Sequence, residues 1–139
     1  MKKNVSQTIF AFVIILISVF LIFYSIDAPN QEPARADTTV RVYFANDSAV
    51  KTMLLEDYVA GVLCGEMPMS FEDEALKAQA VAIRTYTVKK IGSNIAEHHG
   101  ADICTDSTHC QAFKTREQCG NDETYDKAVR IANETKDEI

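Results

Sequence analysis

An uninterrupted apolar run near the N-terminus is the strongest pattern of hydrophobic and polar positions in the chain. It extends from Ile9 to Ile26, 18 residues without a charged side chain, close to the roughly 20 that a helix needs to cross a bilayer. Two lysines precede the run and no acidic residue does. By the positive-inside rule, we expect residues 1–8 to be a cytoplasmic stub and 9–26 a single-pass anchor in the cell membrane, with the rest extracytoplasmic.

A cleaved signal peptide is the alternative interpretation, because Ala34-Arg35-Ala36 has the small-x-small form of a cleavage site. The run is longer than the apolar part of a signal peptide, usually about 7–15 residues, and Ala36 lies ten residues beyond its end. We therefore favour an uncleaved anchor. Residues 27–38 are polar and contain two of the three prolines, so we expect a linker before a domain at 39–139.

An alternation with a period of two follows the linker. Val40, Val42 and Phe44 alternate with more polar neighbours, which predicts a half-buried strand over 39–44. Residues 46–48 read Asn-Asp-Ser and predict a turn, after which 49–53 can pair back as a second strand. We expect a short β-hairpin.

Three helices are predicted beyond the hairpin. The first begins at Leu55, the second is capped by Ser70 and closed by Gly92, and the third begins near Asp122. Apolar stripes at helical spacing comprise Leu55, Val59, Val62 and Leu63 in the first helix, and Tyr125, Ala128, Val129 and Ala132 in the third. With the hairpin, these helices predict an α+β fold.

The second helix is rich in alanine, so neighbouring elements can approach it closely. Arg84 and Gln79 are polar residues in that setting. Since buried polar groups need hydrogen-bond partners whatever the function, we expect both to be structural rather than ligands of a substrate.

The acidic residue Glu66 stands between the first two helices, in an apolar stretch over 63–69. Pro68 favours an extended Met67, and Gly65 can adopt dihedral angles closed to other residues, so we expect a sharp bend. Apolar neighbours would partly desolvate the carboxyl group and favour its protonated form, which suits a general acid. A solvated glutamate without function at a helix end is the alternative.

A cluster of metal-ligand residue types lies over 97–111. It places His98, His99, Cys104, His109 and Cys110 within 13 residues. Two thiolates and two imidazoles suit tetrahedral zinc. The spacing is not that of a standard zinc finger, and adjacent His109 and Cys110 need an irregular backbone to point inward together.

A Cys104–Cys110 disulfide explains the same residues without a metal, and is plausible outside the cytoplasm. Cys64 and Cys119 are then either free or paired, since four cysteines allow three connectivities. The residues alone leave the metal and the disulfide equally open.

Charge excludes one class of partner. All 20 acidic residues lie beyond the apolar run, against only 12 of the 14 basic ones, so the extracytoplasmic part carries a formal charge of −8. Phosphate backbones are bound by clustered Lys and Arg, so we expect no nucleic-acid partner.

Four segments of the chain resemble the stage II sporulation protein D family and its relatives, the amidase-enhancer proteins. They are Glu56–Val62, Gly65–Pro68, Glu74–Tyr86 and Cys110-Gln111. The resemblance implies a membrane-anchored lytic transglycosylase that cuts peptidoglycan glycan strands, with Glu66 as the catalytic acid. It also implies a partner, a cell-wall amidase that first removes stem peptides. The family's domain continues well beyond the position of Ile139, so the resemblance implies a chain truncated at its C-terminus.

The resemblance favours metal over disulfide, because family members with this loop hold zinc through two Cys and two His. Those positions correspond to His98, Cys104, His109 and Cys110, with His99 as the alternative to His98. Four protein ligands leave no open position, so the zinc would be structural and would fix the loop beside Glu66. A second function is open, that of a non-catalytic peptidoglycan-binding module that recruits or stimulates an amidase.

Overall fold

A computed structural model of the chain describes residue 9 and residues 13–17, 37–93 and 95–139. The chain divides into two units, 1–36 and 37–139. In the part that is described, no helix is both long and apolar enough to cross a bilayer. Most of the expected anchor, the stub at 1–8 and the linker up to residue 36 lie outside the described residues, so the anchor stays a prediction.

The second unit is built on a small mixed sheet. Strands β1 (Thr39–Phe44) and β2 (Ala49–Leu54) form the expected antiparallel hairpin, in which Val40 faces Met53. A two-residue strand, β3 (Ile103–Cys104), pairs parallel to β1, giving the order β2-β1-β3. Two residues carry no periodicity, which is why β3 was not predicted from the sequence.

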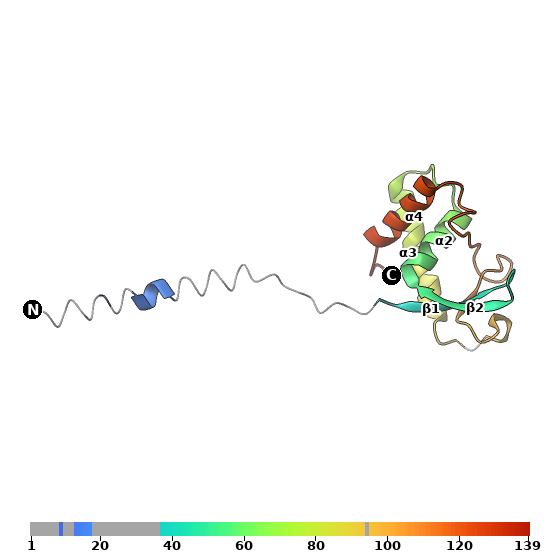
Figure 1. Ribbon diagram of the computed structural model, residues 1–139, viewed down its shortest axis with the longest axis horizontal. Helices are drawn as coiled ribbons and strands as arrows, with labels where there is room; N and C mark the ends of the chain where they lie inside the picture. The colour runs from blue at the N-terminus through green and yellow to red at the C-terminus, as the bar shows by residue number, and fades with distance from the viewer. Residues whose placement is uncertain (1–8, 10–12, 18–36, 94) are drawn as a thin grey trace, which may run out of the picture. The chain divides into compact units, whose positions relative to one another are not determined.

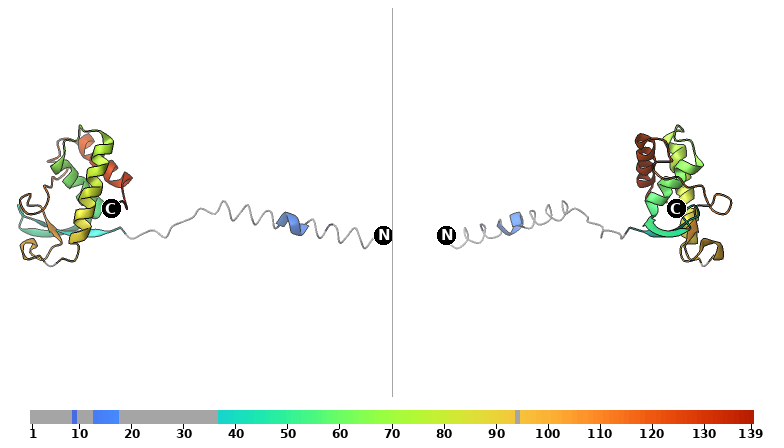
Figure 2. Two further views of the ribbon diagram at one scale, coloured as in Figure 1. Left: turned by 180° about the vertical axis from the view of Figure 1, so that it is seen from behind. Right: turned by 45° about the vertical axis from the view of Figure 1, so that its right-hand side comes forward.

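Three helices pack on one side of the hairpin, as Figure 1 and the two views of Figure 2 show. They are α2 (Leu55–Glu66), α3 (Asp73–Lys90) and α4 (Asp122–Glu134), and a single 3₁₀ turn, η1 (Ala96–His98), follows α3. The core lies between the inner face of β1 and the three helices, and includes Val40, Val42 and Ile131, which are fully buried. The α+β prediction is confirmed.

The two ends of α3 differ in how well they were predicted. Gly92 follows the helix with φ of +77°, as expected of a closing glycine. Ser70 is not the cap, because the helix begins at Asp73 and Glu72 precedes it without a side-chain capping bond. The backbone bends before that, where the Phe71 N–H donates to the Pro68 carbonyl (3.1 Å), and Ser70 lies within this turn.

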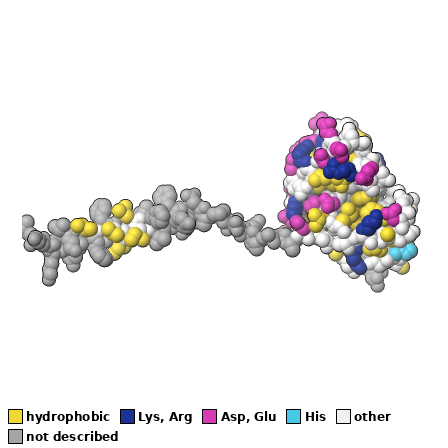
Figure 3. Space-filling view, in the orientation of Figure 1, with side chains coloured by type: hydrophobic (Ala, Val, Ile, Leu, Met, Phe, Trp, Pro, Cys, Tyr) yellow, Lys and Arg dark blue, Asp and Glu magenta, His cyan; other side chains and the backbone are white. Residues whose placement is uncertain are grey.

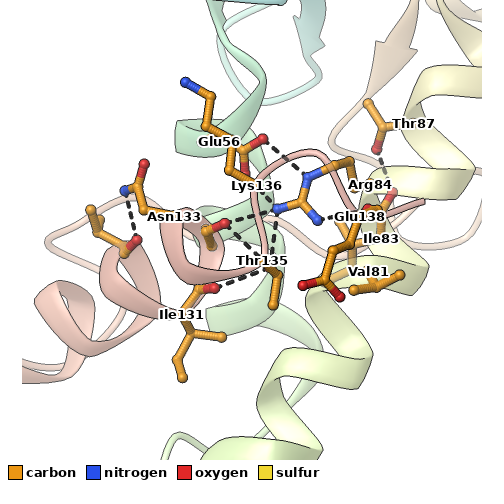
Figure 4. A network of polar contacts seen from close by, with 12 residues as sticks. Glu56, Val81, Ile83, Arg84, Thr87, Ile131, Asn133, Thr135, Lys136 and Glu138 are labelled. Carbon is orange, nitrogen blue, oxygen red and sulfur yellow. Dashed lines mark hydrogen bonds and ion pairs between the residues drawn. The ribbon is translucent and has the colours of Figure 1, made fainter. Parts of the chain in front are cut away.

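Arg84 joins all three helices, which confirms its structural role (Figure 4). Its guanidinium is 2% exposed and donates to both carboxylate oxygens of Glu56 on α2, at 3.0 and 2.6 Å. It also donates to the carbonyls of Ala132 and Glu138 and to the hydroxyl of Thr135, at or beyond the end of α4. The charge is thereby paired and its donors are satisfied, as burial requires.

Candidate active site and metal centre

Glu66 is the last residue of α2, and the bend expected after it is present. Met67 is extended (φ −131°, ψ 143°) ahead of Pro68, as proline requires of its predecessor. The expected desolvation is wrong, because the Glu66 side chain is exposed. Its neighbours Leu63 and Cys64 are buried in the core, but Glu66 is at the end of the helix, where the side chain reaches solvent.

One backbone group fixes the Glu66 carboxylate. The Ala112 N–H donates to Oε1 at 2.6 Å, a short bond of the kind made to a charged acceptor. Oε2 has no hydrogen-bond partner among the described residues. The carboxyl group is therefore oriented from one side and open on the other.

The segment that carries Ala112 packs against glycines of α2. A Cβ on Gly65 would collide with the Ala112 carbonyl, and a Cβ on Gly61 would collide with the Phe113 ring. The Lys114 N–H donates to the Gly61 carbonyl at 3.0 Å. Gly65 is thus required for close approach and not, as expected from the sequence, for an unusual backbone conformation, since it lies within the helix.

A disulfide attaches the far end of this segment to the same helix. Cys64 and Cys119 are bonded, with 5.6 Å between their Cα atoms and a separation of 55 positions in the sequence. The pairing that the sequence left open is therefore Cys64 with Cys119, and Cys104 and Cys110 are free thiols.

Four potential metal ligands converge at the other end of the segment. One ligand atom each from His98, Cys104, His109 and Cys110 lies within 4.8 Å of the others. The His98 Nε2 is 3.2 Å from the Cys110 sulfur, and the His109 Nδ1 is 3.4 Å from that of Cys104 and 3.6 Å from that of Cys110. This group could hold a metal ion.

The backbone supplies the irregularity that adjacent ligands need. The Cys110 N–H donates to the Asp106 carbonyl at 2.7 Å, and the Asp106 carboxylate accepts from the Thr108 N–H at 2.8 Å. This tight turn brings the side chains of His109 and Cys110 to the same point. Cys104 comes from β3 and His98 from the end of η1.

His99 does not join the cluster. It is exposed, adopts the left-handed conformation (φ 51°), and lies 4.2 Å from the Tyr43 ring, centroid to centroid. Of the two candidates, only His98 belongs to the group of four potential ligands.

Burial makes the uncharged forms of the cluster favourable when no cation is present. It raises the pKa of the Cys104 thiol to about 11, with the neighbouring Cys110 adding to the effect. It also lowers the pKa of His98, which the nearby His109 lowers further. A neutral imidazole is ready to bind a metal, whereas the thiols bind as thiolates, so metal binding would release protons from them.

The Ala112 N–H is the site group that sequence reasoning missed. A backbone donor has no side-chain signature, and alanine occurs throughout this chain. Its position directly after Cys110-Gln111, one of the segments that carry the family resemblance, is the signal that could have identified it.

The chain is similar in sequence to known proteins. The family model described as "Stage II sporulation protein" matches residues 43–139. Stage II sporulation protein D of Bacillus amyloliquefaciens is 40% identical over 81 residues, which is 58% of this chain and 24% of that protein. The protein of the same name from Bacillus subtilis (strain 168) is 39% identical over 79 residues, 56% of this chain and 23% of that protein.

The chain thus spans about a quarter of the length of these curated relatives. The matched region includes the hairpin from Tyr43 onward, all of α2, α3 and α4, Glu66 and the His/Cys cluster. Because the family model covers most of the chain, the protein belongs to the stage II sporulation protein family.

Proposed function

We propose that this protein is a peptidoglycan lytic transglycosylase that acts in sporulation, at engulfment, from a membrane anchor with its domain extracytoplasmic. Glu66 is the catalytic residue. The observation that carries the proposal is the state of its carboxyl group, which is held at Oε1 by the Ala112 N–H and open at Oε2. A general acid or base must lie within hydrogen-bond reach of the proton that it transfers, and the open Oε2 can be reached by a glycosidic oxygen.

The reaction needs a single carboxyl group. Glu66 gives its proton to the glycosidic oxygen as the bond to the anomeric carbon breaks. The 6-hydroxyl of the same sugar attacks that carbon, and the Glu66 carboxylate takes the hydroxyl proton, leaving a 1,6-anhydro end. A hydrolytic glycosidase normally needs a second carboxylate, whereas an intramolecular hydroxyl already has a high effective concentration.

A structural zinc would be held by His98, Cys104, His109 and Cys110. The donor set fits, because two thiols that are not joined to each other and two imidazoles converge, the usual ligands of closed tetrahedral zinc. Bound there, zinc supplies a fixed crosslink and has no open position for chemistry. Ala112 follows Cys110 by two residues, so a fixed Cys110 helps to place the N–H that orients Glu66.

The second candidate is a non-catalytic module that binds peptidoglycan and recruits or stimulates a cell-wall amidase. It is favoured by one observation, that the Glu66 side chain is exposed, whereas a desolvated carboxyl group is expected of a general acid. The two proposals share their partners, glycan strands and an amidase, and neither involves nucleic acid, consistent with the acidic net charge.

The substitution Glu66→Gln separates the two proposals, because it keeps the shape of the side chain and removes the transferable proton. We expect the release of 1,6-anhydro products from peptide-free glycan strands to fall by at least about 10²–10⁴-fold, the usual contribution of general acid–base catalysis, while glycan binding is retained. The assay is run on this chain and on a version extended with the remaining part of a curated relative.

Glu72→Gln is the matched control, since Glu72 is also exposed and its side chain makes no capping bond. It should leave the activity unchanged. Full activity of Glu66→Gln in the extended chain would reject the acid assignment and favour the binding module.

A further inference from the structure

The segment 110–119 is attached to α2 by one covalent bond and by few weak contacts. Its hydrogen bonds to that helix are those from Ala112 to Glu66 and from Lys114 to Gly61. The Phe113 ring adds apolar contact, stacked on Tyr58 at 5.8 Å between centroids. The covalent bond is the Cys64–Cys119 disulfide, whose helical end lies two residues before Glu66.

The His/Cys cluster cannot replace this attachment. Only Cys110 of the cluster lies within the segment. The other ligands are His98 of η1, Cys104 of β3 and His109, which directly precedes the segment, so the cluster would fix the beginning of the segment to the sheet. The later part of the segment is bonded to α4, through Arg116 to Asp122 and Asp126. Among the crosslinks described, only the disulfide fixes the segment to the helix that carries Glu66.

We propose that the Cys64–Cys119 disulfide positions Glu66. The disulfide keeps segment 110–119 against the face of α2 that carries Gly61 and Gly65. It thereby keeps the Ala112 N–H bonded to the Glu66 carboxylate. The proposal rests on the proposed function only for the catalytic role of Glu66. A covalent link keeps the local concentration of the segment at the helix high. Without the link, the two hydrogen bonds and the packing of Phe113 on Tyr58 remain, and water competes for the exposed bond to Glu66.

The position of Glu66 then depends on the redox state of the pair. Cys119 is half-buried and Cys64 is 5% exposed, so exchange begins at Cys119. A thiolate of an external dithiol attacks the Cys119 sulfur, and Cys64 leaves as a thiolate that takes a proton. The second thiol of the dithiol then displaces Cys119, so the dithiol is oxidised to a disulfide and both cysteines are reduced.

Amide hydrogen exchange and chemical shifts test the proposal on the full chain, labelled with ¹⁵N and supplied with zinc. In the disulfide-bonded chain we expect slow exchange at the Ala112 amide, whose resonance moves when Glu66 is replaced by Gln. In the double variant Cys64→Ala/Cys119→Ala, we expect exchange at Ala112 to be about 10- to 100-fold faster, the range for losing a hydrogen bond to a charged group. The effect of Glu66→Gln on that resonance should disappear.

Ile131→Val is the control for general destabilisation, because it removes one methylene from the core and leaves the disulfide intact. It should not change exchange at Ala112. If the double variant does not fold, the same two measurements on the reduced natural chain take its place. The proposal is overturned if Ala112 keeps its slow exchange and its response to Glu66→Gln without the disulfide, or if Ile131→Val accelerates exchange equally.

The outcome is independent of the proposed function. If the Ala112 resonance no longer responds to Glu66→Gln when the disulfide is absent, the result supports the positioning of the carboxylate. If Glu66→Gln still cleaves glycan fully, the result rejects the catalytic role of Glu66 without affecting the positioning proposal. Where both proposals hold, the double variant should lower kcat and leave KM unchanged, because the binding surface is retained and the acid is misplaced.

Discussion

At the scale of single residues, the family motifs have separate physical roles. Glu56 forms an ion pair with Arg84, and Tyr58 is fully buried in the core. Glu56 and Tyr58 therefore stabilise the fold. Glu66 makes one bond, to a backbone N–H, and is exposed. An exposed acid that is oriented by its surroundings and contributes nothing to the core is the residue whose position calls for a functional explanation.

Replacing Arg84 with Met should lower the free energy of unfolding by about 3–5 kcal/mol, the usual cost of removing one partner of a buried ion pair. Glu56 would remain in a largely buried position without its partner, and the carbonyls of Ala132 and Glu138 would lose a donor. Urea denaturation followed by circular dichroism measures the change.

The control for this prediction is Arg130→Met, because Arg130 pairs with Asp73 and Glu134 at the surface. Exposed pairs contribute about 0–1 kcal/mol. Equal losses in the two variants would contradict the role given to Arg84.

At the scale of elements, the His/Cys cluster and the disulfide hold opposite ends of one irregular segment. In Figure 3 the visible histidine side chains lie at the right-hand edge of the domain. The segment has no helix or strand of its own between Thr105 and Asn121. The disulfide holds one end of this segment, and a metal bound to the cluster would hold the other. Removing either should therefore affect Glu66.

The first element-scale prediction concerns the metal. The purified protein should contain about one zinc per chain and lose thermal stability in a chelator, because the energy of metal binding is part of the folding energy. Cys104→Ser should abolish both the zinc content and the effect of the chelator, as measured by elemental analysis and thermal denaturation. His99→Ala is the matched control and should retain both, since His99 lies outside the cluster.

Mass spectrometry provides an independent check. After alkylation without reduction, Cys104 and Cys110 should carry the label, whereas Cys64 and Cys119 should not. A Cys104–Cys110 disulfide in a protein free of metal would refute the zinc site.

At the scale of the whole molecule, the folded domain and the apolar run are separate units. The domain brings its two ends together, since Asp37 and Lys136 form an ion pair of 2.7 Å, and it has a single sheet with helices on one side (Figure 1). The predicted membrane anchor lies within residues 1–36 and rests on the amino-acid sequence alone.

The topology prediction follows from that composition. We expect one uncleaved membrane helix over Ile9–Ile26, motivated by its 18 uncharged residues and the preceding lysines. N-terminal sequencing of the protein recovered from membranes should return Met1 or Lys2. A mature chain that begins at Asp37 would indicate cleavage after Ala36.

The sequence by itself determined what depends on local periodicity and on side-chain chemistry. The alternation at Val40, Val42 and Phe44 and the stripes of α2 and α4 predicted their elements, because neighbouring residues decide which face of a strand or helix is apolar. The bend after Glu66 followed from Pro68, whose ring restricts Met67 directly. Cys and His types suggested a metal before any distance was known.

Only the tertiary structure decided the features that depend on distant segments. Glu66 is exposed and bonds to Ala112, and Gly65 allows the close approach of the same residue, which is about 46 positions away in the sequence. The disulfide pairs Cys64 with Cys119, which is 55 positions away. His99 has a left-handed backbone conformation, and only the structure showed that His98, rather than His99, lies with the other potential metal ligands. Local patterns carry no information about such contacts, because the packing of the whole domain brings these residues together.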